Sequence, residues 1–222
     1  MVGKEGRLIP ILPVFGNHDL KKINREVATP SRPPLFFKLF AMPEPLKGYR
    51  ALRFGDYLSL FLLDTGHYSL ITGAQTEWLK KSLEENQSTA FRMAAYHVSA
   101  YPSVYSYKDA VPQRVRTYWV PLFEKYLVDT AFENHNHAYK RTFRIKEGCV
   151  DPSGVQYLGD GSWGVAPRPP KEGLWYIAKQ AKVNSFWLVT MEDGLCTFES
   201  KDIKGKTIEK VTSTLEAFQE ER

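Results

Sequence analysis

Histidine is the residue type on which chemistry in this chain would depend. The chain has five histidines, and four of them come directly after short apolar segments with the pattern of buried strands: His18, His97, His135 and His137. A single histidine after a strand is usually structural, but four of five in that position are hard to explain by packing. Because neutral imidazole is a common ligand for Zn and Fe, the pattern indicates a metal centre.

Two short motifs contain three of these histidines and add further polar groups. In Gly16-Asn17-His18-Asp19, the amide oxygen of Asn17 could bind a hard cation, and Asp19 could orient and polarise the imidazole of His18. In His135-Asn136-His137, the two rings could point at one metal or at two adjacent metals. Each motif taken alone is also compatible with a structural turn.

The elements that must position these residues alternate between strands and helices. We predict strands at 8–14, 91–96 and 128–132, and each runs into a loop that contains Asn or His. Ligands of α/β sheets sit beyond the strand ends, so these loops could converge on one site. The pattern Thr-x-x-Gln at 72–75 predicts a capped helix to about Asn86, with Trp78, Leu79 and Leu83 facing inward.

The rest of the chain reads as further strands, one more helix and irregular segments. Apolar residues at helical spacing over 115–126 predict a helix that is kinked or restarted at Pro121. Gly55-Asp56 and Asp193-Gly194 predict hairpin turns. The strands are expected at 49–54, 57–63, 141–145, 155–158, 186–191 and 195–199. Five prolines make 29–48 irregular, and the tail from Thr214 is weakly helical.

Composition favours one domain over residues 1–222. Apolar residues make up 43% and aromatic residues 14%, enough for a packed core. The net charge of +5 is not clustered, which argues against a nucleic-acid partner. No segment is apolar enough for a membrane span, and no signal peptide is visible at Met1. Whether Cys149 and Cys196 pair, and the oligomeric state, stay open.

In combination, the motifs resemble those of the calcineurin-like metallophosphoesterases. The segment 16–19 resembles their G-N-H-[DE] block, 94–97 resembles the later strand-then-His block, and 134–137 resembles G-H-x-H with Asn134 in place of Gly. The connecting sequence resembles the purple acid phosphatase branch in particular, at 62–65, 73–79, 121–129 and 137–142. The similarity covers about 8–164, and residues 165–222 would add C-terminal strands and a tail.

This resemblance implies a fold and an activity. The fold would be α/β (α+β type), a two-sheet β-sandwich flanked by helices. The activity would be hydrolysis of a phosphate ester by a hydroxide activated at two metal ions, Fe with Zn, Mn or Fe, whose identity is open. Asn17, His97 and His135 would bind one metal and His137 the other.

The resemblance also assigns the remaining roles. His18 would protonate the leaving alcohol as general acid, steered by Asp19. His67 matches no motif and would lie at the surface or on the substrate rim. A secreted or periplasmic location is favoured, with a phosphate ester as the expected partner.

The chain departs from the family in ways that leave two interpretations. Residues 1–16 contain no Asp or His, so the two earlier metal motifs, including the bridging Asp, are expected to be missing. The G-D-x-x pattern at 159–163 does not replace them, because its last residue is Trp163, whose indole cannot bind metal. Lys140 stands where the branch has Glu, and 106–109 stands where plant-type members have a His pair. The chain is either a phosphoesterase lacking its N-terminal part or a catalytically silent fragment that at most binds metal or a partner.

Overall fold

The central element of the fold is an eight-stranded mixed sheet. The computed structural model describes residues 5–20, 35–40, 46–159 and 161–214. The strand order is β1-β2-β3-β4-β7-β5-β6, with β8 also paired to β5. The strands are β1 (Arg50–Phe54), β2 (Leu58–Leu62), β3 (Phe91–Val98), β4 (Thr130–Asn134), β5 (Tyr139–Lys146), β6 (Cys149–Val150), β7 (Val155–Gly159) and β8 (Ile177–Ala181).

The middle of this sheet is parallel. β2, β3, β4 and β7 all run in the same direction, while β1 pairs antiparallel with β2 and β5 pairs antiparallel with β7 and β8. Parallel neighbours need crossover connections: α2 lies between β2 and β3, α3 and α4 lie between β3 and β4, and β5 and β6 connect β4 to β7. The carboxyl ends of the parallel strands therefore meet at one edge of the sheet, which is the expected place for a site.

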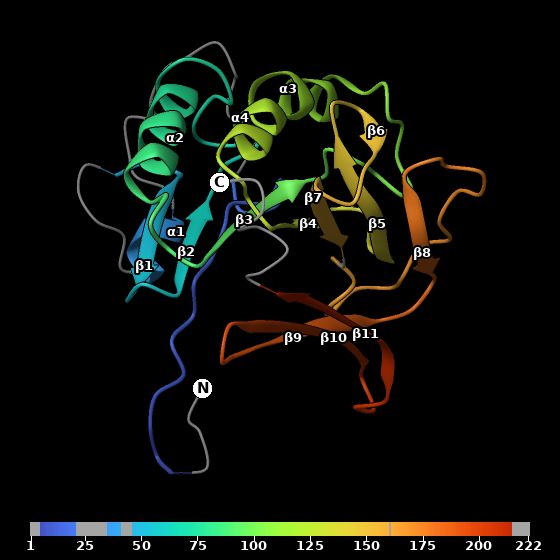
Figure 1. Cartoon of the computed structure of the whole chain (residues 1–222). Helices are drawn as coiled ribbons and strands as arrows, with labels where there is room; N and C mark the ends of the chain where they lie inside the picture. The colour runs from blue at the N-terminus through green and yellow to red at the C-terminus, as the bar shows by residue number, and fades with distance from the viewer. Residues whose placement is uncertain (1–4, 21–34, 41–45, 160, 215–222) are drawn as a thin grey trace.

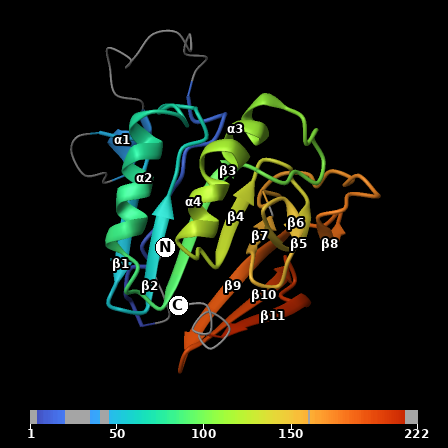
Figure 2. The same ribbon diagram turned by 45° about the horizontal axis from the view of Figure 1, so that its top comes forward.

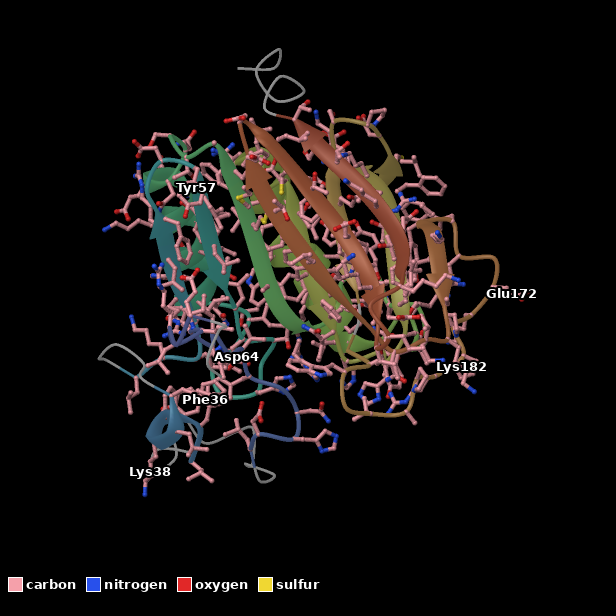
Figure 3. All side chains as sticks on the ribbon, turned by 90° about the horizontal axis from the view of Figure 1, so that it is seen from below. Phe36, Lys38, Tyr57, Asp64, Glu172 and Lys182 are labelled. Atoms are coloured by element: carbon pink, nitrogen blue, oxygen red, sulfur yellow. The ribbon has the colours of Figure 1, made fainter. Side chains whose placement is uncertain are left out.

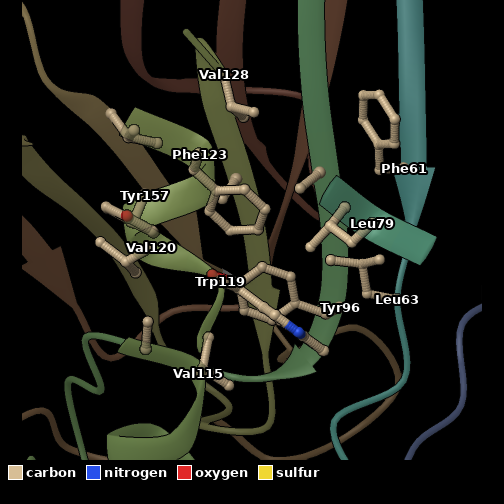
Figure 4. Packing of buried hydrophobic residues seen from close by; sticks show 14 of the residues in the cluster. Phe61, Leu63, Leu79, Tyr96, Val115, Trp119, Val120, Phe123, Val128 and Tyr157 are labelled. Carbon is tan, nitrogen blue, oxygen red and sulfur yellow. The ribbon is translucent and has the colours of Figure 1, made fainter. Parts of the chain in front are cut away.

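Helices cover one face of the sheet. Figure 1 and Figure 2 show α2 (Ala74–Glu85), α3 (Ala110–Tyr118) and α4 (Val120–Lys125) side by side over it. The short α1 (Leu35–Leu39) packs through Phe36 against Phe15. The main core lies between these helices and the sheet, where Trp119 and Phe123 pack against Tyr96 (Figure 4). The break between α3 and α4 falls at Trp119, so the predicted helix is restarted just before Pro121.

A three-stranded antiparallel sheet covers the opposite face. It consists of β9 (Ser185–Glu192), β10 (Leu195–Asp202) and β11 (Thr207–Thr214), in the order β11-β10-β9. Figure 3 shows this sheet lying across the larger one. Phe198 and Cys196 from β10 pack with Phe91, Met93 and Leu158 from the large sheet in a second apolar cluster. The fold is thus a two-sheet sandwich with helices on one side, as predicted.

Several predicted elements are confirmed and others are wrong. Both hairpins form, with β1–β2 turning after Phe54 and β9–β10 turning at Asp193-Gly194, where both residues have positive φ. No strand forms at 8–14, which runs extended with a single bridge residue at Leu8 (Figure 1). Pro10 and Pro13 lack the N–H that a sheet ladder needs, which opposes strand pairing there.

The prediction of a capping box at the start of α2 is also wrong. The helix begins at Ala74 after Gly73, without a side-chain cap. The amide of Gln75 instead donates to the backbone oxygens of Asp64 and Leu70 and accepts from the Asp64 N–H. The sequence prediction missed α1, β6, β8 and β11. Residues 215–222, the predicted helical tail, and much of 29–48 lie outside the described residues.

Candidate metal centre

The predicted site residues lie at the carboxyl edge of the parallel strands. His97 is the penultimate residue of β3, and His135 follows directly after β4. Asp64 and His67 follow β2, the neighbouring parallel strand. The loop 16–19 reaches the same edge from outside the sheet, since Asn17 contacts His97.

Three predicted ligands meet at a single atom. The Asn17 Oδ1 lies 2.8 Å from the His97 Nε2, and the same nitrogen lies 2.9 Å from the His135 Nδ1. An amide oxygen and two imidazole nitrogens thus converge from the loop 16–19, the end of β3 and the loop after β4. These are the atoms through which Asn and His bind metals, so the arrangement fits part of a metal site.

The loop 16–19 depends on a glycine for its close approach to His97. A Cβ at Gly16 would lie 3.2 Å from two ring atoms of His97, tighter than most side-chain contacts. The turn is closed by two bonds, since the Gly16 N–H donates to the Asp19 carboxylate (2.7 Å) and the Asp19 N–H donates to the Gly16 carbonyl (3.2 Å). The carboxylate of Asp19 thus fixes the turn that presents Asn17 and His18, both of which are exposed.

The H-x-H loop has an unusual backbone. His135 and His137 have φ of 71° and 57°, in the left-handed region that non-glycine residues rarely adopt. Such conformations cost about 1–3 kcal/mol each and persist where the surrounding structure fixes them. Asn136 does this, because its buried amide accepts from Val104 N–H and Tyr105 N–H and donates to Ser99 Oγ and Asn134 O.

The environment keeps the clustered imidazoles neutral. Burial, and to a lesser extent the neighbouring imidazoles, lower the pKa of His97 to about 3. Burial also lowers the pKa of His135 to about 4, with a contribution from the positive charge of Arg168. The pKa of His137 is lowered for the same reasons. Neutral imidazole is the form that binds metals, so near neutral pH these nitrogens have their lone pairs available.

The donor set is incomplete within the described part of the chain. Over those residues, no three His, Cys, Asp or Glu side chains cluster as a metal site would require. The converging set contains two imidazoles and one amide, and no carboxylate. His137 affects the pKa of His97 electrostatically but does not join the contact at His97 Nε2. Asp160, from the rejected 159–163 pattern, lies outside the described residues.

Sequence reasoning missed two residues beside the site. The Tyr105 ring stacks on His135, with centroids 4.9 Å apart and planes inclined by 28°. Arg168 donates to the Tyr105 hydroxyl, and its backbone N–H donates to the His137 carbonyl (2.7 Å). No local motif contains either residue, because the contacts join loops far apart in sequence. His67, expected at the surface or substrate rim, lies 5.3 Å from His97 between ring centroids.

A fully buried ion pair lies beneath the histidine loops. The Lys140 ammonium donates to the Glu133 carboxylate and to the Tyr101 carbonyl, and both side chains are at most 1% exposed. The other Glu133 oxygen accepts from the Tyr96 hydroxyl (2.7 Å) and the Ala100 N–H (2.6 Å). The pair therefore joins the strand ends that carry His97 and His135. Lys140, which departs from the family pattern, has this buried carboxylate as its partner.

Comparison with known proteins supports the same family. No family model matches the chain. It is 27% identical over 170 residues to purple acid phosphatase 23 of Arabidopsis thaliana, covering 69% of this chain and 34% of that protein. It is 26% identical to purple acid phosphatase 15 of the same plant (69% and 29% covered) and 30% identical to purple acid phosphatase 18 (51% and 25% covered). The chain spans about a quarter to a third of these relatives.

Solved structures share the fold. The purple acid phosphatase PPD1 from yellow lupin (Lupinus luteus) seeds aligns with a TM-score of 0.68 at 16% identity, covering 79% of this chain and 34% of that one. GAP50, described as the anchor in the inner membrane complex of Plasmodium, aligns with a TM-score of 0.58 at 12% identity, covering 77% and 57%. In sequence the chain is therefore similar to purple acid phosphatases over about two thirds of its length, and its fold is similar to that of the purple acid phosphatase PPD1.

Proposed function

We propose that the chain contributes to a metal-dependent site that hydrolyses phosphate esters. Asn17, His97 and His135 would hold one metal ion, and His137 would contribute to a second. When bound, such ions supply Lewis acidity that activates water and offsets phosphate charge. The observation that carries the proposal is the convergence of Asn17 Oδ1, His97 Nε2 and His135 Nδ1 within 2.9 Å contacts.

The chain's own residues would handle the proton of the leaving group. In the overall reaction, one water is consumed, the bond between phosphorus and the alcohol oxygen breaks, and phosphate and a neutral alcohol form. His18 would donate the proton that the alcohol oxygen needs as it leaves. Its exposure and its place next to Asn17 suit a group that contacts substrate, while Asp19 holds the turn in shape.

Metal titration tests the ligand assignment. Isothermal titration of the 222-residue chain with Zn²⁺ should show binding that His135→Ala and His97→Ala each abolish or weaken by about tenfold or more. His18→Ala is the matched control, since it removes an imidazole from the same edge without removing a proposed ligand. Metal loss in His18→Ala with retention in His135→Ala would reverse the two roles.

A second candidate is a catalytically silent domain that keeps the fold. Two observations favour it: the converging donor set holds no carboxylate, and the similar fold of GAP50 belongs to a protein described as an anchor. The two candidates differ in one measurement. Zn²⁺ binding together with hydrolysis of an aryl phosphate supports the enzyme, whereas hydrolysis that stays at the buffer rate with metal bound supports the silent domain.

The helices bear on whether the chain spans a membrane, and the family resemblance bears on its cellular location. None of the helices among the described residues has the length and apolar character of a membrane span. A secreted or periplasmic location remains an expectation from the family resemblance. Cys149 and Cys196 are both free thiols, one exposed and one buried.

A further inference from the structure

A cavity of about 350 Å³ opens beside the candidate metal centre. Asn17 and His135 form part of its lining, so the cavity adjoins the converging donor atoms. Its size falls in the range of small-molecule pockets, which begins at about 300 Å³. A group attached to a phosphate held at the centre would therefore enter this cavity.

The wall of the cavity is held in place before any ligand binds. Tyr105 lines it and stacks on His135. The backbone N–H groups of Val104 and Tyr105 donate to the buried Asn136 amide at 3.0 and 3.2 Å, and Arg168 donates to the Tyr105 hydroxyl. Contacts from two loops thus fix the Tyr105 ring. Because the ring is already ordered, ligand binding would cost little free energy for ordering it.

The lining selects against charged ligands. Half of the twelve lining residues are apolar or aromatic: Val98, Pro102, Tyr105, Ala110, Val111 and Pro112. No Lys or Arg is among the lining residues that the structure describes, and the one carboxylate is Asp109, which also precedes α3. Among the lining residues, an anionic group in the cavity would face only this carboxylate as a charged side chain, and Arg168 beside the cavity already donates to the Tyr105 hydroxyl. Burying a charge without a partner is costly.

We propose that this cavity receives the alcohol portion of a phosphate monoester whose alcohol is uncharged and aromatic or otherwise apolar. This inference rests on the proposed function, because the phosphate must be held at the metal centre. It names the substrate class that the cavity accepts and excludes esters that carry a second phosphate or a carboxylate on the alcohol side.

Three non-hydrolysable phosphonates test the inference. With the 222-residue chain and saturating Zn²⁺, isothermal titration compares phenylphosphonate, methylphosphonate and phosphonoacetate. Burial of a phenyl ring should make phenylphosphonate bind about 10- to 100-fold more tightly than methylphosphonate. Phosphonoacetate should bind no more tightly than methylphosphonate.

A variant at the cavity mouth makes the test specific. Ala110 lines the cavity and is exposed as the first residue of α3, so Ala110→Trp should fold and fill the space. The ratio of phenylphosphonate to methylphosphonate affinity should fall to about one. The matched control is Lys80→Trp, which adds the same ring at an exposed position of α2 and should leave the ratio at its wild-type value.

The outcomes distinguish failure of the cavity assignment from failure of the proposed function. Binding of methylphosphonate with no preference for the phenyl compound overturns the cavity assignment and leaves the proposed function standing. Tightest binding of phosphonoacetate overturns the substrate class. Failure of all three phosphonates to bind overturns the proposed phosphate site and the cavity assignment together.

Discussion

Replacing Lys140 by Met should destabilise the chain strongly, because it leaves a buried carboxylate without its cation. Both partners of the Lys140–Glu133 pair are at most 1% exposed. One Glu133 oxygen keeps two hydrogen bonds, from Tyr96 and Ala100, but the other is bonded to the Lys140 ammonium. Breaking a buried pair in this way typically costs about 3–5 kcal/mol, a large share of the ~5–15 kcal/mol that stabilises a domain.

Replacing both partners together should restore most of that loss. In Glu133→Gln with Lys140→Met, no charge remains buried, and the Gln amide oxygen can still accept from Tyr96 and Ala100. Exchange of a whole buried pair for neutral groups is often neutral or stabilising by about 1–4 kcal/mol. The assay is urea denaturation of the wild type, both single variants and the double variant, followed as a double-mutant cycle.

The cycle has a clear refuting outcome. A cost below about 1 kcal/mol for Lys140→Met would show that solvent reaches the pair, as for an exposed ion pair. A steric control comes from Gly159, where a Cβ would lie 2.6 Å from the Cγ and the Cε of Lys140. Gly159→Ala should therefore destabilise the wild type, and Lys140→Ala should relieve most of that effect.

Three further predictions concern the site loop, pH and turnover. Asn136→Ala should cost about 1–3 kcal/mol in denaturant unfolding and speed amide exchange at Val104 and Tyr105, because their N–H groups lose a buried acceptor. Burial raises the pKa of Asp129 to about 6, so its native form binds a proton more tightly than the unfolded form. Its stabilisation is full below about pH 4 and lost as pH rises to 6, by roughly 3 kcal/mol, and Asp129→Asn should flatten that slope. Because the converging donors carry no carboxylate, the 222-residue chain with added Zn, Mn or Fe should hydrolyse an aryl phosphate far more slowly than an intact family enzyme.

The sequence predicted the loops of the site better than the contacts within them. His97 and His135 could be placed because buried apolar strands end directly before or at them, and parallel strands bring such ends to one edge. The placement of Asn17 beside His97, 80 residues away, was expected only from the family resemblance. The motifs did not predict the packing around them, such as the stacking of Tyr105 on His135. This packing depends on the contact between two loops that are far apart in sequence.

Local rules misled the prediction where tertiary contacts use the same groups. Gln75 fits a capping box, but its amide bonds the backbone at Asp64 and Leu70 and so ties α2 to the end of β2. The run at 8–14 has the apolar content of a strand, but two prolines remove ladder donors. Lys140 looked like a simple departure from a family pattern, and only the three-dimensional structure shows that Glu133 lies opposite it.

The long-range origin of the converging donor atoms has a consequence for how the chain folds. Asn17 and His97 are 80 residues apart, and His97 and His135 are 38 apart. The unfolded chain therefore offers no preassembled set of donors, and contacts of such separation form slowly because long loops must close first. In the native structure the trio depends on the parallel pairing of β3 with β4, which places His97 and His135 at neighbouring strand ends. Any ion that binds it would act on the finished fold, slowing unfolding rather than guiding early folding.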